Sequence, residues 1–450
     1  MTNIEQYRVT KNCYKGEIDG YGYAFVPGSS FGIVLLDLKT KKLLDNSRLL
    51  YRDKDQTRMK LLLQHKLLEH INVAEPYYSL EIDKIKSVEI WLHVTNDCNL
   101  DCPYCYIINK DSSRMSHATA NACLEKLEQT VNRHQLETVS IRIAGGEPTL
   151  NEPVVKYVIS ECRKRFIDNG VKVKFIILTN GTLLNEDWIQ LIADNNIKLC
   201  VSLDGIGRWH DKLRFFKNGK GSFDRVVKNL DLCIKNGIQP WILTTITDDN
   251  IDGIPVLSKF LIDSNLPFRY GVFRDNSGSY RDYQEFIDRV QNVLEYSYTY
   301  YAHAIREQNA NFSHQLSDIH LDARRHLRSC NIGYSGVTVN HLGQIFLCQA
   351  YMKNPLGTIW DKPDFLELAW SQQTLPELNG VIVTNYEGCQ DCSWALVCGG
   401  GCPIVNTSAY GLATHASPYC KLFKWAIPKL IELKALSLIN KYKVSIKSIH

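Results

Sequence analysis

The sequence predicts an α/β protein whose centre is a partial, TIM-like (β/α)6 barrel. From about residue 87, short runs rich in β-branched residues alternate with stretches that show the helical spacing of apolar residues. The connecting segments are short, and this alternation implies a parallel sheet. A chain of 450 residues with 44% apolar residues is long enough to bury the core of such a barrel and of further units.

We expect six strands and five intervening helices in the barrel. The predicted strands are Ser87–Thr95, Val139–Ala144, Lys172–Thr179, Lys198–Leu203, Trp241–Thr247 and Pro267–Arg274. The predicted helices are Ala118–His134, Glu152–Phe166, Asn185–Asn195, Ser222–Asn236 and Gly253–Ser264. In barrels of this kind the functional residues lie at the carboxyl ends of the strands.

The segments on either side of the barrel divide the rest of the chain. Residues 1–86 form an α+β extension, with strands predicted at Tyr21–Phe25 and Phe31–Asp37 and an amphipathic helix at Thr57–Ile71. Two roles fit this extension, a small docking module or a plain addition that packs on the barrel. The barrel itself covers residues 87–275, and a helical linker follows at 276–328. A cysteine-rich region at 329–425 and a C-terminal helix or tail at 426–450 complete the chain.

Charge and hydropathy argue against two classes of partner. The 52 basic and 48 acidic residues give a net charge of +4, and no basic run suggests a nucleic-acid surface. The first thirty residues lack the apolar segment of a signal peptide, and no apolar run approaches the roughly 20 residues that cross a bilayer. We therefore expect a cytoplasmic protein with neither nucleic acid nor membrane as partner.

Fifteen cysteines in a chain without a secretion signal favour metal ligation over disulfides. Five of them are scattered through predicted helices and strands or stand alone, and most of these are expected to be small core residues. The other ten form two groups. The first group is Cys98, Cys102 and Cys105, and the second is Cys330, Cys348, Cys389, Cys392, Cys398, Cys402 and Cys420.

The first cysteine group follows directly on the first predicted strand. Three thiolates leave one iron of a [4Fe–4S] cluster without a protein ligand, so that it is free to bind another molecule. A structural zinc site would need a fourth ligand within reach. Neither His93 nor His117 has the spacing of a zinc finger, and the pattern therefore favours the cluster.

The motif Cys98-x3-Cys102-x2-Cys105, with Tyr104 before its third cysteine, resembles that of the radical S-adenosylmethionine (SAM) superfamily. The resemblance implies that the open iron binds SAM and that one-electron reduction yields a 5′-deoxyadenosyl radical, which the protein orients and shelters. It also implies SAM contacts at later strand ends, where glycines allow close approach and an arginine fork suits a carboxylate. These residues are Tyr104, Gly145, Gly146, Glu147, Asn180, Ser202, Asp204 and Arg214.

The second cysteine group resembles the SPASM extension of radical SAM enzymes that modify peptides and proteins. That resemblance implies two auxiliary [4Fe–4S] clusters, and hence three clusters in all. The implied outer ligands are Cys389, Cys392, Cys398 and Cys420, and the implied inner ligands are Cys330, Cys348 and Cys402.

The ligands of the inner auxiliary cluster depart from the family pattern. Family members with a fully protein-bound inner cluster carry another cysteine shortly before the first of the seven, whereas this chain has Arg324, His326 and Arg328 there. Either the inner cluster keeps an open iron, or His320 or His326 completes it. Zinc stays an alternative, since Cys-x2-Cys pairs also occur in zinc ribbons.

These resemblances imply a radical SAM/SPASM enzyme that acts on a peptide or protein. Our leading hypothesis is a maturase that installs a carbon–carbon or ether crosslink in a ribosomally made precursor peptide, as cyclophane-forming and darobactin-type enzymes do. A flavodoxin- or ferredoxin-type protein would supply electrons. The alternatives are an anaerobic sulfatase-maturing enzyme, a peptide epimerase or thioether synthase, and a non-catalytic zinc-binding adaptor. Arg274 and Asp275, at the end of the sixth predicted strand, are candidate catalytic groups that would anchor the substrate or accept a proton.

Overall fold

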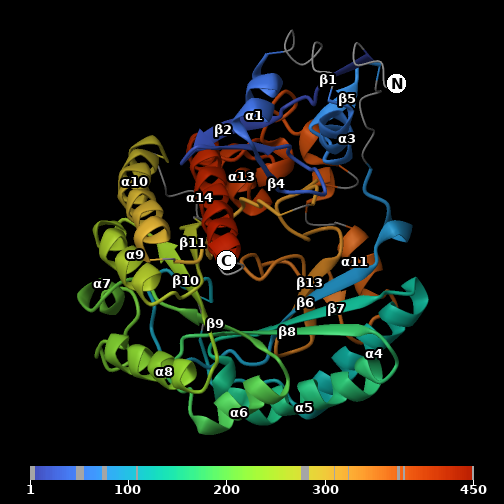
Figure 1. The fold of residues 1–450 in the computed structure, drawn as a ribbon. Helices are drawn as coiled ribbons and strands as arrows, with labels where there is room; N and C mark the ends of the chain where they lie inside the picture. Colours follow the sequence, from blue (N-terminus) through green and yellow to red (C-terminus); the bar gives the residue numbers. More distant parts are fainter. Residues whose placement is uncertain are drawn as a thin grey trace.

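The computed structural model has a mostly parallel sheet at its centre (Figure 1). It describes residues 6–46, 55–72, 79–107, 110–274, 283–308, 310–322, 324–371, 375–378 and 381–447. Within these ranges the central sheet has ten strands in the order β12-β11-β10-β9-β8-β7-β6-β13-β14-β15. Strands β6 to β11 lie in sequence order, as successive βα units require.

The six predicted barrel strands and their five helices are confirmed. The strands are β6 (Ser87–His93), β7 (Thr138–Ala144), β8 (Lys172–Thr179), β9 (Lys198–Ser202), β10 (Trp241–Ile246) and β11 (Phe268–Val272). The main helices are α4 (His117–His134), α5 (Glu152–Cys162), α6 (Glu186–Asp194), α8 (Phe223–Lys235) and α9 (Ile254–Asp263). Shorter turns are η2 (Ile82–Lys84), η3 (Pro148–Asn151), η4 (Arg163–Ile167), α7 (Arg208–Asp211) and η5 (Ile251–Gly253).

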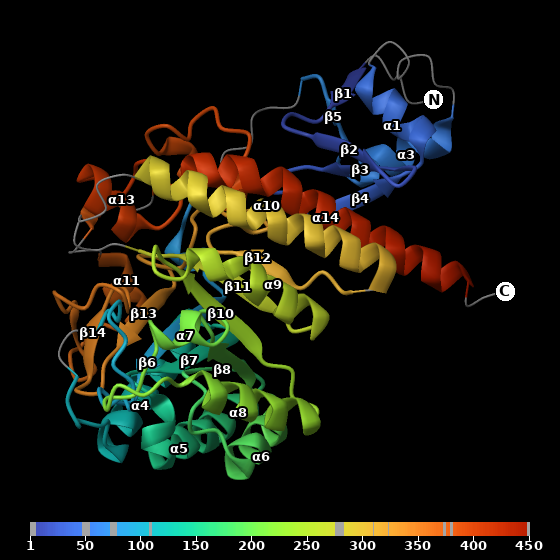
Figure 2. The same cartoon turned by 90° about the vertical axis from the view of Figure 1, so that its left-hand side faces the viewer.

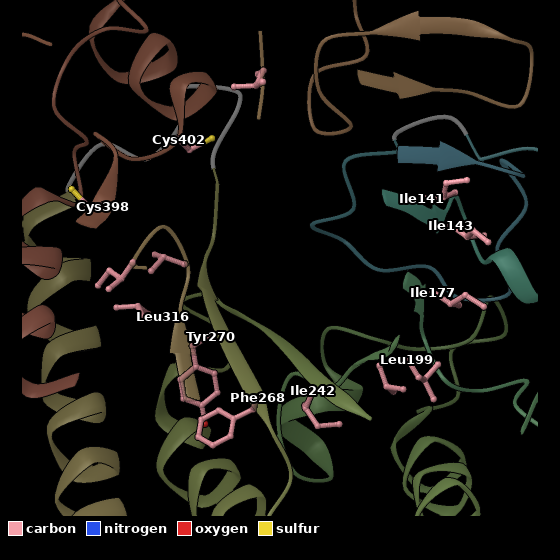
Figure 3. Packing of buried hydrophobic residues seen from close by; sticks show 14 of the residues in the cluster. Ile141, Ile143, Ile177, Leu199, Ile242, Phe268, Tyr270, Leu316, Cys398 and Cys402 are labelled. Carbon is pink, nitrogen blue, oxygen red and sulfur yellow. The ribbon is translucent and has the colours of Figure 1, made fainter. Parts of the chain in front are cut away.

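Side chains alternate along the barrel strands, and one face of the sheet packs against the helices. Buried residues such as Ile141, Ile143, Ile177 and Leu199 lie on this face and belong to one hydrophobic cluster. Figure 3 labels these four side chains on neighbouring strands. Successive residues of a strand point to opposite faces, so the residues between them line the inside of the curved sheet. The apolar layer thereby fixes which side chains reach the barrel interior.

The cysteine-rich region extends the barrel sheet. Strand β13 (Gly336–Val339) pairs in parallel with β6, with Thr338 opposite Trp91. Strands β14 (Gln344–Phe346) and β15 (Gly357–Thr358) continue the sheet in antiparallel fashion. The remaining elements of this region are α11 (Phe365–Ser371), η6 (Pro376–Leu378), η7 (Val383–Asn385), α12 (Ala395–Cys398) and α13 (Pro403–Tyr410).

Two long helices lie side by side over the barrel (Figure 2). Helix α10 (Tyr283–Gln308) lies within the predicted linker, and α14 (Cys420–Lys447) forms the C-terminal end. The linker also contributes a strand, β12 (His314–Leu316), which pairs in parallel with β11. Because α14 begins at Cys420, the last cysteine belongs to the terminal helix. None of the helices in the described ranges has the length and apolar character needed to cross a membrane.

The N-terminal extension has two small sheets and sits against α14 (Figure 2). One sheet has the order β2-β3-β4, and the other pairs β1 with β5. Their bounds, with those of the two helices, are β1 (Tyr7–Val9), β2 (Tyr14–Ile18), β3 (Tyr21–Phe25), β4 (Ile33–Leu36), α1 (Leu38–Asp45), α3 (Gln56–Gln64) and β5 (Leu68–His70). The helix expected to reach Ile71 ends at Gln64, because Lys66 adopts a positive φ of 58° and Leu68–His70 then pair as a strand.

Candidate functional site

Cys98, Cys102 and Cys105 lie together on the loop after β6. Cys98 is buried, and the other two are half-buried. The Cys105 N–H donates to the Cys102 carbonyl at 3.2 Å, which folds the second half of the motif into a tight turn. Burial, together with the charges of Glu147 and Cys102, raises the pKa of Cys98 to about 11. The loop therefore gathers three thiols beside a buried carboxyl group.

Gly145 and Gly146, at the end of β7, lie in close contact with the backbone that leads into the cysteine loop. The Gly146 N–H donates to the Thr95 carbonyl and the Glu147 N–H to the Asp97 carbonyl, both at 2.8 Å. A Cβ on Gly146 would lie 2.1 Å from the Asp97 oxygen, and one on Gly145 would lie 2.4 Å from the Thr95 oxygen. Gly145 also has a φ of +142°, which side chains disfavour. Glycine is needed here because two backbone segments touch.

The Glu147 carboxylate is fully engaged inside the protein. It accepts hydrogen bonds from the Thr149 N–H and hydroxyl, from the Thr179 hydroxyl at 2.6 Å and from the Asn180 N–H at 2.7 Å. Burial raises the pKa of Glu147, while these four hydrogen bonds act in the opposite direction. The side chain thus connects the end of β7 to the end of β8.

Asn180 links the end of β8 to the cysteine loop. Its Nδ2 donates to the Asn99 side chain at 2.8 Å and lies 4.0 Å from the Cys98 sulfur. Asn99 in turn donates to the Thr182 hydroxyl at 2.8 Å. The residue directly after the first cysteine is thereby fixed to the next strand end.

A buried charge pair faces the cysteine loop from the other side. Arg214 Nε donates to Asp204 Oδ2 at 2.5 Å, and the Tyr104 hydroxyl donates to the same oxygen. The Thr245 N–H donates to Asp204 Oδ1 at 2.8 Å. The Arg214 guanidinium also lies over the Tyr104 ring, 5.5 Å from its centroid. Tyr104 of the cysteine loop thus meets Asp204, which lies 100 residues later in the chain, and Arg214. Half-buried Ser202 ends β9 two residues before Asp204.

His210 and Ser222 complete this charge pair, and sequence reasoning missed both. His210 Nδ1 accepts from the Asp204 N–H at 3.2 Å, and its Nε2 lies 3.0 Å from the Ser222 hydroxyl. Ser222 donates in turn to the Arg214 carbonyl at 2.8 Å. Burial lowers the pKa of His210 to about 4, so that the ring is neutral at pH 7 with its proton on Nε2. In the sequence, the signal for this contact was the spacing of four residues between His210 and Arg214.

The three cysteines expected to bind an inner auxiliary cluster lie near Arg274. Its Nη1 lies 3.6 Å from the Cys402 sulfur, and its Nη2 donates to Asp318 at 2.8 Å. The charge of Asp318, and then that of Cys402, raises the pKa of the guanidinium. A cavity lined by Arg274, Asp318, Cys402 and Tyr419 opens at this point. Arg274 therefore bridges the barrel and the cysteine-rich region, whereas Asp275 lies outside the described residues.

The side chains near the expected fourth inner ligand all have protein partners. The His320 and His326 rings stack at 4.1 Å between centroids. His320 Nε2 lies 3.2 Å from the Ser329 carbonyl, and His326 Nε2 lies 2.6 Å from Asp322. Arg324 also contacts Asp322. The guanidinium of Arg328 donates to four backbone carbonyls, those of Val381, Ile332, Gly333 and Leu378.

The four cysteines expected to bind an outer auxiliary cluster come from three parts of the chain. Cys389 and Cys392 form one turn, Cys398 ends α12 and Cys420 begins α14. Burial first, and then the other three thiols, raise the pKa of Cys398 to about 12. Within the described ranges, no group of three or more His, Cys, Asp or Glu side chains is arranged to hold a single metal ion. A four-iron cluster instead takes each thiolate at a different iron, and the donor chemistry of all three cysteine sets fits such a group.

Comparison with known protein families identifies the barrel. The model of the Radical SAM superfamily matches residues 92–258. This range runs from the end of β6 into α9 and includes the cysteine loop, both glycines and the Asp204–Arg214 pair.

Three relatives illustrate how far the similarity extends. An uncharacterised protein of Methanocaldococcus jannaschii is 33% identical over 38% of this chain, which spans 57% of that relative's length. The cysteine-type anaerobic sulfatase-maturating enzyme of Clostridium novyi is 24% identical over 73% of this chain and 91% of its own. The radical SAM cyclopropyl synthase TigE of Paramaledivibacter caminithermalis is 22% identical over 80% of this chain and 79% of its own.

Two solved structures share the fold. Native anSMEcpe with bound AdoMet and the Cp18Cys peptide has a TM-score of 0.62 at 20% identity, covering 77% of this chain and 99% of that one. Streptococcus suis SuiB bound to the precursor peptide SuiA has a TM-score of 0.55 at 17% identity, covering 92% and 100%. At these identities the matches concern the fold, and they extend well beyond the barrel.

Proposed function

We propose that this protein, a radical SAM enzyme whose radical SAM domain spans residues 92–258, removes a hydrogen atom from a peptide substrate and carries two auxiliary clusters. A radical SAM domain implies one [4Fe–4S] cluster and SAM. The observation that carries the proposal is that the loop of Cys98, Cys102 and Cys105 meets the buried Asp204–Arg214 pair at the carboxyl ends of the strands.

We assign Cys98, Cys102 and Cys105 to the first cluster. When bound, the cluster and SAM supply the 5′-deoxyadenosyl radical on one-electron reduction. The residues of this chain bind and orient these two groups. Arg214 presents a charged donor whose position is fixed by Asp204, and Tyr104 packs beneath its guanidinium. Glu147 and Asn180 hold the loop that carries the cysteines.

The auxiliary clusters extend this assignment. We assign Cys330, Cys348 and Cys402 to the inner cluster, and Cys389, Cys392, Cys398 and Cys420 to the outer one. Within each set, the charge of one cysteine raises the pKa of another, which supports the grouping. His320 and His326 each engage a protein oxygen through Nε2, which leaves Nδ1 for a metal, as in many histidine ligands. Both an open iron and a histidine ligand therefore fit the inner cluster.

The proposed substrate is a ribosomally made precursor peptide in which a side-chain crosslink forms. Support comes from SuiB, whose structure was solved with a precursor peptide and whose fold this chain shares over 92% of its length. The N-terminal extension, residues 1–86, is the proposed docking module for the leader, because β2 and β4 are edge strands to which a peptide strand can be added. A flavodoxin- or ferredoxin-type donor supplies the electrons.

Sulfatase maturation is the second candidate function. The relative from Clostridium novyi is named for that activity and aligns over 73% of this chain. The two candidates differ in substrate, one a precursor peptide and the other a sulfatase segment whose cysteine or serine becomes formylglycine.

Anaerobic reconstitution tests the proposal. Protein loaded with iron and sulfide is incubated with SAM and dithionite, and 5′-deoxyadenosine is measured by mass spectrometry. We expect its formation in the wild type and its loss in Cys102→Ala. A precursor peptide encoded beside the gene should lose two hydrogens, whereas turnover of a sulfatase peptide alone would establish the second candidate. Colourless protein that contains zinc and no sulfide would contradict both.

A further inference from the structure

The inner face of the barrel carries three cationic side chains at two levels. Arg142 lies between buried Ile141 and Ile143 of β7, and Arg269 lies between buried Phe268 and Tyr270 of β11. Since strand side chains alternate between faces, both arginines point away from the helices and into the barrel. Lys198 lies in the same row of the sheet as Arg142, because Ile176 of β8 pairs with both. Arg269 pairs through Leu243 with Ser202, four residues beyond Lys198 on β9, and Trp241 lies at the level between Lys198 and Arg269.

These cations outnumber the carboxylates available to them. Arg142 Nε lies 2.7 Å from Glu89 Oε2, without the alignment of a hydrogen bond. The Lys198 ammonium lies 3.9 Å from the centroid of the Trp241 ring. Neither the Lys198 side chain nor the Arg269 guanidinium makes a hydrogen bond or ion pair with any residue in the described part of the chain.

The three charges act on one another across the curved sheet. Desolvation, and then the charges of Arg142 and Arg269, lower the pKa of Lys198. Desolvation, and then the charges of Arg274 at the rim and of Arg142, lower the pKa of Arg269. β7 and β11 are four strands apart, about 19 Å along a flat sheet at about 4.8 Å per strand, so the curvature of the barrel brings them closer. Lys198 is exposed and Arg269 is half-buried, and cations of like charge held near each other are stabilised by a bound anion.

We propose that Lys198 and Arg269 form an anion subsite that binds a carboxylate of the peptide substrate inside the barrel. This inference rests on the proposed function, because it specifies the substrate. Arg269 precedes the end of β11 at Val272 by three residues, or about 10 Å at about 3.3 Å per residue. The carboxylate therefore lies within about three residues of the reacting carbon at the rim. It is either the C-terminal carboxylate of the peptide or an Asp or Glu side chain.

Tryptophan fluorescence provides a test that needs neither reductant nor SAM, because Trp241 lies against Lys198. The reconstituted protein is titrated at constant ionic strength with N-acetylalanine, with N-acetylglutamate α-amide and with the neutral N-acetylglutamine amide. We expect saturable quenching by the two acids only. The tighter acid identifies a backbone or a side-chain carboxylate as the source. Equal quenching by the neutral amide, or by added chloride alone, overturns the proposal.

Variants locate the subsite. Arg269→Gln and Lys198→Gln should each weaken acid binding at least tenfold, while Arg225→Gln, on the outer helix α8, should leave it unchanged. Arg269→Gln removes a cation that its neighbours repel, so its thermal midpoint should not fall. Lys198 is exposed at the start of β9, so Lys198→Gln should also retain the fold. Unchanged acid binding in both variants overturns the subsite.

A separate readout distinguishes this inference from the proposed function. SAM cleavage without peptide should be the same in Arg269→Gln as in the wild type, because neither Arg269 nor Lys198 is among the residues assigned to the first cluster or to SAM. If SAM cleavage is absent while the acids still bind, the proposed function fails and the subsite stands. If SAM is cleaved and the acids do not bind, the subsite alone is wrong.

Discussion

At the scale of single residues, Gly146 is the position where a side chain would displace the cysteine loop. A Cβ there would lie 2.1 Å from the Asp97 oxygen, which belongs to the backbone and cannot rotate away as a flexible side chain would. Gly146→Ala should lose the first cluster, about four irons per chain, by iron and sulfide analysis. Gly237→Ala is the matched control. Its φ is +75° with no atom within 4 Å, so only a backbone cost of about 1 kcal/mol is expected. Wild-type iron content in Gly146→Ala would contradict this role.

The Asp204–Arg214 pair gives a second prediction at this scale. Asp204 is fully buried, so Arg214→Gln leaves its charge without a counterion and should lower the free energy of unfolding by about 3–5 kcal/mol. The double variant with Asp204→Asn should lose less than the sum of the two single losses, by anaerobic urea denaturation. Lys235→Gln breaks an exposed pair with Asp231 at the same 2.5 Å and should cost under about 1 kcal/mol. Additive losses in the double variant would show that the pair is not coupled.

Sequence reasoning could predict the members of this site but not their partners. Asp204 and Arg214 were expected to contact SAM, and the structure places them against each other with Tyr104. Such residues can be identified by their position just after a strand, because the carboxyl ends of parallel strands lie at the same edge of the sheet. The role of His210 depends on the path of the chain between the two, which local pattern does not encode.

At the scale of elements, the six barrel strands were predictable because each is a long run flanked by helical periodicity. Strand β13 was not, since its four residues lie among cysteines and glycines and gain their strand conformation only by pairing with β6. Leu68–His70 likewise continued an apolar helical pattern and became a strand through pairing with β1. Non-local pairing overrides local preference in both cases.

Strand β13 also gives a prediction. Thr338 is buried and lies between Trp91 of β6 and Phe346 of β14. Thr338→Pro removes a backbone donor from the middle of the sheet and should lower the free energy of unfolding by about 3 kcal/mol. Thr338→Val keeps the shape and the backbone donor and serves as control. Because β13 joins the cysteine-rich region to the barrel, fluorescence and cluster absorbance should shift together in Thr338→Pro. Separate transitions would indicate two independent units.

At the scale of the whole molecule, three buried histidines on separate elements make stability depend on pH. Burial is the main cause that lowers the pKa of His93 and His210 to about 4 and that of His314 to about 3. The unfolded chain takes up these protons near pH 6.5, before the folded protein does. Stability from these groups is therefore complete above about pH 6.5 and is lost as the pH falls towards 4, at about 1.4 kcal/mol per pH unit for each histidine.

His314→Phe, in a site lined by Phe268 and Tyr298, should reduce this slope by one such increment in urea denaturation between about pH 6.5 and 5. Comparison of the two proteins at each pH cancels the acid sensitivity of the clusters, and an unchanged slope would show that His314 is protonated in the folded state.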